Sequence, residues 1–161
     1  MDYSSFQKVT GIIQNINSGG ACCMQIISLM TEDQETIDFV VSPDTVIIDC
    51  TRLRRGMRVA AFYDQNLPAP AVYPPRYQAE LITAVRRDQN VMLSYFDENL
   101  VSEDNSLKLN LTPFTNIVTQ NGQRFLCSPG NENLLVYYTV STRSIPAQTT
   151  PQKIVVMCPS S

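Results

Sequence analysis

One short pattern occurs twice in this chain, and it restricts the possible fold more than any other feature of the sequence. Ile37 to Ile48 reads I-D-F-V-V-S-P-D-T-V-I-I, and Leu107 to Val118 reads L-K-L-N-L-T-P-F-T-N-I-V. In both segments, alternating apolar residues precede a Ser/Thr-Pro-x-Thr corner, and valine or isoleucine follows it. An internal repeat of this kind reports how a protein is built rather than what chemistry it performs. The sequence therefore predicts two copies of one β-rich unit.

Alternation of apolar and polar residues predicts strands along the first copy, while amphipathic helical periodicity never persists for three turns. The expected strands span residues 7–17, 21–30, 36–41, 57–63 and 77–87. Four prolines exclude a central strand from the connection that precedes the last of them. Five strands with an irregular link before the fifth is the order of an OB-like barrel. We predict an all-β protein of two tandem OB-like barrels, residues 1–85 and a diverged second barrel, residues 86–161.

The second copy follows the first without a linker. Asn90 to Phe96 matches Ala21 to Ile27, Leu134 to Val140 matches Val59 to Gln65, and Lys153 to Met157 matches the closing strand. The first strand of the second copy then falls on Leu81 to Arg87, a segment that already closes the first copy. We therefore expect a shared or continuous strand near residues 77–90 to fuse the two barrels. Each half alone would bury only about 60% of its unfolded surface, so the two halves should depend on each other.

Composition disfavours several kinds of partner. The net charge of −3 works against binding to nucleic acid or to anionic membranes, where a basic surface supplies most of the affinity. No apolar run approaches the length of a membrane span. Asp2 follows Met1 where a secretory signal would be basic, so with Met1 as the natural start we expect a cytoplasmic protein.

Residue types also argue against catalysis and metal binding. The chain has no histidine, which removes the usual general base and the Ser-His and Cys-His nucleophile pairs. Its five cysteines are odd in number and lack the paired Cys-x-x-Cys spacing of a zinc site. Acidic pairs such as Glu32-Asp33 lie in expected turns without a calcium-loop pattern. We therefore expect no enzyme, with no catalytic residues, no cofactor and no metal.

The most distinctive stretch is the proline-rich connection before the last strand of the first copy. Prolines stiffen such a loop and lower the entropy lost on binding, while Tyr73 and Tyr77 offer amphipathic area and Arg76 a planar donor. In OB folds this loop commonly borders the ligand groove, so the turn that begins at Asn17 is expected nearby. Alternatively, both tyrosines fold back and plug the barrel mouth, which is the commoner use of such a loop. The candidate binding surface consists of Phe62, Tyr63, Tyr73, Arg76, Tyr77 and Asn17.

The same stretch resembles an uncharacterised bacterial domain family, whose members often lie beside copper-amine-oxidase-N-like domains in surface proteins. The matching residues are Phe62-Tyr63-Asp64, Pro68, Pro70, Tyr73-Pro74-Pro75, Tyr77 and the preceding Gly56-Met57-Arg58-Val59. The resemblance covers the first half of the chain, and the second half only through the repeat. It implies an OB-like fold and no particular activity. Because no export signal precedes the pattern in this sequence, we do not expect the surface role to apply here.

A cluster of arginines supports a different function. Arg52, Arg54, Arg55 and Arg58, with aromatic residues close in the sequence, could contact the phosphates and bases of single-stranded nucleic acid. The alternative is a solvated rim in which these arginines pair with Asp44, Asp49 and Asp64, and the net negative charge favours it. We therefore expect a non-catalytic module that binds a protein or peptide, with single-stranded nucleic acid as the other hypothesis. Exposed strand edges also make a homodimer possible.

Overall fold

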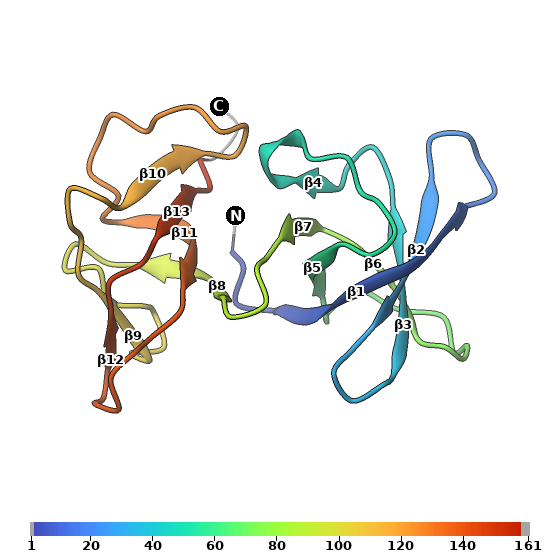
Figure 1. The fold of residues 1–161 in the computed structure, drawn as a ribbon, viewed down its shortest axis with the longest axis horizontal. Helices are drawn as coiled ribbons and strands as arrows, with labels where there is room; N and C mark the ends of the chain where they lie inside the picture. Colours follow the sequence, from blue (N-terminus) through green and yellow to red (C-terminus); the bar gives the residue numbers. More distant parts are fainter. Residues whose placement is uncertain (1, 159–161) are drawn as a thin grey trace. The chain divides into compact units, whose positions relative to one another are not determined.

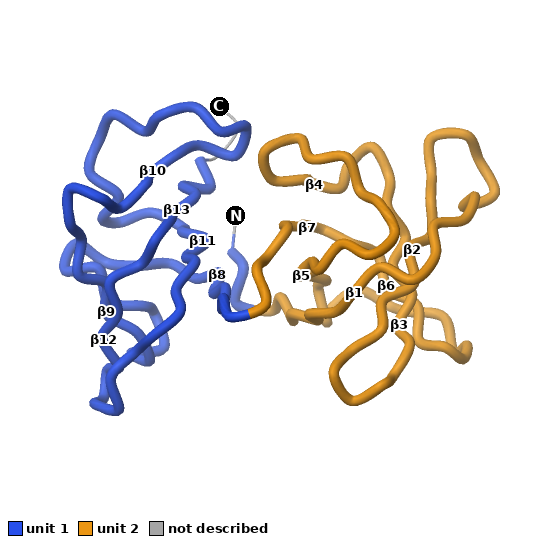
Figure 2. Tube along the Cα trace, viewed as in Figure 1, with its two compact units in different colours: residues 1–4, 88–161 blue, residues 5–87 orange. Residues whose placement is uncertain are grey.

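The computed structural model describes residues 2–158 and consists almost entirely of strands and their connections (Figure 1). Its one helical segment in those residues is a 3₁₀ turn, η1 (Ile48–Cys50), and none of them forms a helix that could span a membrane. The all-β prediction is therefore confirmed. The chain divides into two compact units, which Figure 2 colours separately. Unit 2 is Ser5–Arg87, and unit 1 begins at Asp88 and includes the residues before Ser5.

Unit 2 contains one sheet with the strand order β4-β7-β5-β1-β2-β3-β6. Its strands are β1 (Phe6–Ser18), β2 (Gln25–Met30), β3 (Thr36–Val41), β4 (Val46–Ile47), β5 (Arg58–Asp64), β6 (Arg76–Gln78) and β7 (Leu81–Ala84). The long β1 pairs with β5 through its first half and with β2 through its second half. Gly11 lies where these halves meet, and a Cβ there would stand 2.7 Å from the carbonyl oxygen of Met30. This close approach explains why a residue without a side chain occupies the position.

The segment expected to be one last strand is two short strands. Between β6 and β7, the amide of Ala79 donates to the carbonyl of Val40 in β3 (3.0 Å). The next amide, of Glu80, donates to the carbonyl of Phe62 in β5 (2.8 Å). Ala79 and Glu80 are adjacent in the chain but donate to two different strands, β3 and β5. The backbone therefore twists between these two residues. Ala79 and Ile82 consequently both enter the core, although strict alternation placed them on opposite faces.

The main core cluster of unit 2 takes residues from several strands. Phe39 of β3, Ile27 and Leu29 of β2, and Val59 and Ala61 of β5 are fully buried in one cluster. Each pair within a strand is two residues apart, as expected for residues on one face of a strand, while Ala60 and Phe62 are buried on the opposite face of β5.

Unit 1 contains two sheets, of order β10-β13-β11-β8 and β12-β9. Its strands are β8 (Asn90–Phe96), β9 (Leu107–Leu109), β10 (Asn116–Thr119), β11 (Glu132–Tyr138), β12 (Ala147–Thr149) and β13 (Lys153–Val156). Its core cluster again alternates along the strands, with Leu134 and Val136 from β11 and Ile154 and Val156 from β13.

The two units pair their strands by the same scheme. In unit 2, β3 is parallel to β6, β4 is parallel to β7, and β5 is antiparallel to β7. In unit 1, β9 is parallel to β12, β10 is parallel to β13, and β11 is antiparallel to β13.

The two Ser/Thr-Pro-x-Thr corners also make equivalent hydrogen bonds. The amide of Ser42 donates to Thr45 Oγ1 (3.0 Å), and the amide of Thr112 donates to Thr115 Oγ1 (3.2 Å). The residue after each proline donates its amide to the hydroxyl of the first corner residue, at 3.2 Å in both corners. The sequence pattern that occurs twice therefore forms the same local structure twice.

The predicted match between Asn90–Phe96 and Ala21–Ile27 is wrong. Met92 of β8 pairs with Val136 of β11, as Val9 of β1 pairs with Ala61 of β5, so β8 takes the place of β1. The place of β2 is taken by two isolated bridges, Phe96 with Ser102 and Val101 with Lys108. The expected shared or continuous strand near residues 77–90 is also absent from these described residues, because β7 ends at Ala84 and β8 begins at Asn90 after a turn. Because β8 is the first strand of unit 1, β7 does not also have to act as that strand.

Candidate functional site

The connection between β5 and β6, residues 65–75, is an exposed and uncharged loop, called here the apolar loop. Tyr73 is 93% exposed, and Leu67 and Val72 are 49% and 47% exposed. The loop is fastened at its start, where the amide of Leu67 donates to the carbonyl of Asp64 (3.1 Å). Three large apolar side chains are thus exposed in one proline-stiffened loop.

The other tyrosine of this segment has the opposite environment. The ring of Tyr77 stacks on the ring of Tyr63, with centroids 4.0 Å apart and planes 11° apart. Both rings lie about equally far from Phe39, at 6.0 and 6.1 Å, and both pack against the core of unit 2. Burial, followed by the neighbouring Tyr77, raises the pKa of the Tyr63 hydroxyl. The structure thus divides the predicted pair, since Tyr77 covers the core and Tyr73 projects away from it.

Two members of the predicted binding surface are misplaced. Phe62 is 4% exposed and lies on the face of β5 opposite to Tyr63, because successive strand residues point to opposite faces. Asn17 is exposed but lies on β1, three strands away from β6. Asn17 pairs with Ile26 of β2, close to the hairpin that joins β1 and β2. Across the sheet, Ile26 pairs with Val40 near the end of β3, whereas Arg76 pairs with Asp38 in the first half of β3. Figure 1 shows this hairpin at the upper right and the apolar loop at the lower right.

Arg76 follows the apolar loop as the first residue of β6. It lies beside Asp38 of β3, which is buried and accepts a 2.7 Å hydrogen bond from the hydroxyl of Ser28. The Nε atom of Arg76 is buried and makes no hydrogen bond within residues 2–158. Arg76 therefore lies at the edge of the candidate site, where the apolar loop joins β6, and not at the exposed part of the loop.

Acidic side chains lie at the other side of the loop's base, a feature the sequence analysis missed. Burial is the largest cause that raises the pKa of Glu80, and the negative charges of Asp64 and Asp44 add to it. No local pattern signals this cluster, because strand pairing brings together residues that are distant in the sequence.

The structure brings three of the four arginines together. Arg52, Arg54 and Arg55 are exposed and line a groove of about 680 Å³, whose wall also includes Leu53 and Ile16. Within residues 2–158 these three arginines form no ion pair, so the predicted pairing with nearby aspartates is wrong. Arg55 instead donates from Nε to the carbonyl of Gln14 (3.0 Å).

Arg58, the fourth member of the predicted basic cluster, has a different role. Its guanidinium lies 3.2 Å from the carboxylate of Glu32, and the residue is partly buried in β5. The basic groove is therefore formed by three arginines only.

The described residues contain no group of three or more acidic or cysteine side chains placed to hold a metal ion. Comparison with protein-family models, curated proteins and solved structures found no match to this chain in any of the three. Its function is therefore inferred from the geometry of its own surfaces.

Proposed function

We propose that this chain is a non-catalytic binding module that recognises a protein or peptide through the apolar loop of unit 2. The observation that supports this most is the 93% exposure of Tyr73 at a loop without charged residues. Exposed tyrosines are frequent anchors of binding energy, because they supply large amphipathic area with few rotatable bonds. The four prolines of the loop lower the entropy that it loses when it binds.

We also infer that each unit is an OB-like barrel and that the two are copies of one ancestral unit. The supporting observations are the consecutive antiparallel pairing of β1, β2 and β3 and the parallel pairing of β3 with β6. The junction of β6 and β7, bonded to β3 on one side and to β5 on the other, supports closure of the barrel. In such a fold the loop before the last strand borders the usual ligand-binding face, which is where the apolar loop lies.

Protein is favoured over sugar as the partner of this loop. The exposed side chains Leu67, Val72 and Tyr73 together supply a single hydroxyl group, so most hydroxyls of a sugar would leave water there without a new hydrogen-bond partner. The apolar loop lacks charges, so its affinity should depend little on salt.

Capture from native cell lysate with paired baits is the first test. The intact chain and Tyr73→Ala are compared with Phe114→Ala, a control whose phenylalanine is also 93% exposed but lies in unit 1. The captured protein is then purified, and its affinity for all three forms is measured at low and high salt. We expect Tyr73→Ala to bind about tenfold more weakly, with the control unchanged and little effect of salt. Equal affinity of the intact chain and Tyr73→Ala would refute this function.

A second candidate function is binding of single-stranded nucleic acid by the groove of Arg52, Arg54 and Arg55. It is favoured by the lack of ion pairs at these arginines within residues 2–158 and by the apolar side chain of Leu53, which lines the groove with them. Titration of a labelled oligonucleotide should then give an affinity that falls steeply with salt, with a shallower slope for Arg52→Ala/Arg54→Ala. An oligonucleotide that does not bind at low salt would exclude this candidate.

A further inference from the structure

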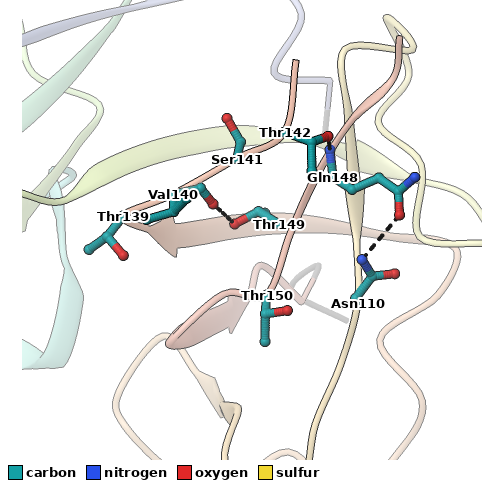
Figure 3. Close-up of a pocket in the computed structure, with 8 residues that line it drawn as sticks. All are labelled: Asn110, Thr139, Val140, Ser141, Thr142, Gln148, Thr149 and Thr150. Atoms are coloured by element: carbon teal, nitrogen blue, oxygen red, sulfur yellow. Dashed lines mark hydrogen bonds between the residues drawn. The ribbon is translucent and has the colours of Figure 1, made fainter. Parts of the chain in front are cut away.

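Unit 1 has a hollow beside the residue that corresponds to Tyr77 of unit 2. Leu109 of β9 pairs with Thr149 of β12 in the same way that Phe39 pairs with Tyr77. A threonine thus takes the place of the tyrosine, and its hydroxyl donates to the carbonyl of Val140. Beside Thr149 lies a hollow of about 340 Å³ (Figure 3).

The walls of this hollow are neutral and rich in hydroxyl and amide groups. Asn110 donates from its amide to the side-chain oxygen of Gln148 (3.2 Å), as a dashed line in Figure 3 shows. Ser141 and Thr150 also line the hollow, and neither hydroxyl makes a hydrogen bond within residues 2–158. No charged residue contributes to the lining, and Val140, 75% exposed, adds an apolar surface.

We propose that this hollow binds a neutral monosaccharide. Its volume lies at the lower end of the range for small-molecule sites, about 300–1,000 Å³. A charged ligand would lose hydration without gaining a counter-charge, and a purely apolar ligand would leave the amide and hydroxyl groups unpaired. A sugar ring carries several hydroxyls for Asn110, Ser141 and Thr150, and it has C–H groups that can contact Val140. The proposal does not depend on the partner of the apolar loop.

Nuclear magnetic resonance titration of the isotope-labelled full chain tests the proposal directly. The probes are D-glucose, D-galactose and N-acetyl-D-glucosamine, and the matched charged probe is D-glucuronate. We expect saturable shifts of the side-chain amide signals of Asn110 and Gln148 with at least one neutral sugar. Binding of D-glucuronate should be about tenfold weaker, because its carboxylate finds no cation among the lining residues.

Two variants of Thr150 separate the loss of a hydroxyl from a change of shape. Thr150→Val keeps the shape of the side chain and should weaken sugar binding about tenfold, whereas Thr150→Ser keeps the hydroxyl and should bind like the intact chain. Tyr73→Ala, in the other unit, should leave sugar binding unchanged. The proposal is overturned if no neutral sugar gives saturable shifts, if D-glucuronate binds equally well, or if the two Thr150 variants behave alike.

Discussion

Removal of the Tyr77 ring should destabilise unit 2, whereas removal of the Tyr73 ring should not. The ring of Tyr77 lies 4.0 Å from that of Tyr63 and 6.0 Å from that of Phe39. Each aromatic pair contributes about 0.5–1.5 kcal/mol beyond the area it buries. Truncation of a fully buried aromatic residue to alanine costs about 3–5 kcal/mol, and Tyr77 is only partly buried. We therefore expect Tyr77→Ala to lower the free energy of unfolding by about 2–3 kcal/mol.

Tyr73→Ala should change the free energy of unfolding by no more than about 0.5 kcal/mol, as expected for an exposed side chain. Tyr77→Phe is the control, since it keeps the stacked ring and loses only the hydroxyl, at a cost of about 1 kcal/mol. Urea unfolding followed by circular dichroism measures all three, with hydrogen exchange in β3 and β6 to assign the change to unit 2. A loss below about 1 kcal/mol for Tyr77→Ala would contradict a core role for this ring.

Three further predictions concern stability. The pKa of Glu80 is raised in the folded protein, so its ionised form is disfavoured there. The free energy of unfolding therefore falls as the pH rises from the pKa of Glu80 in the unfolded chain to its higher pKa in the folded protein, and the loss remains at higher pH. Glu80→Gln should therefore raise the melting temperature at neutral pH and leave it nearly unchanged at acidic pH. Thr45→Val should cost about 1–3 kcal/mol, because Thr45 is buried and its hydroxyl both accepts from and donates to the backbone. Thr115→Val should cost less in the same thermal melts, because within residues 2–158 the Thr115 hydroxyl accepts a hydrogen bond but donates none. Gly11→Ala should destabilise by about 1–3 kcal/mol in urea unfolding, because the added Cβ would clash with a backbone oxygen.

Much of the strand content could be predicted from local alternation. The expected strand 36–41 is β3 to the residue, and residues 57–63 are displaced from β5 by one position. The same alternation could also have separated Phe62 from Tyr63, because neighbouring strand residues point to opposite faces. The predicted binding surface, which contains both Phe62 and Tyr63, does not agree with this alternation.

Pairing partners could not be predicted in the same way. The apolar alternation of Asn90–Phe96 fits the place of β1 as well as that of β2, and only its pairing with β11 decides between them. The opposite environments of Tyr73 and Tyr77 have a similar cause. Tyr77 is held in β6 by its parallel pairing with Phe39, whereas Tyr73 lies outside the strand. The sequence therefore predicted the loop itself, but which of its tyrosines is exposed depended on strand register.

The parallel pairs in each unit also have a consequence for how the chain acquires its structure. Asp38 pairs with Arg76, and Leu107 pairs with Ala147, so the parallel strand pairings join residues that are far apart in the sequence. Folds dominated by such contacts have a high contact order and fold in milliseconds to seconds, since a long loop must close before the pairing is rewarded. During synthesis, β3 leaves the ribosome before its partner β6 has been made. Until then its edge is unpaired, and it is the part of the nascent chain most exposed to association with other strands.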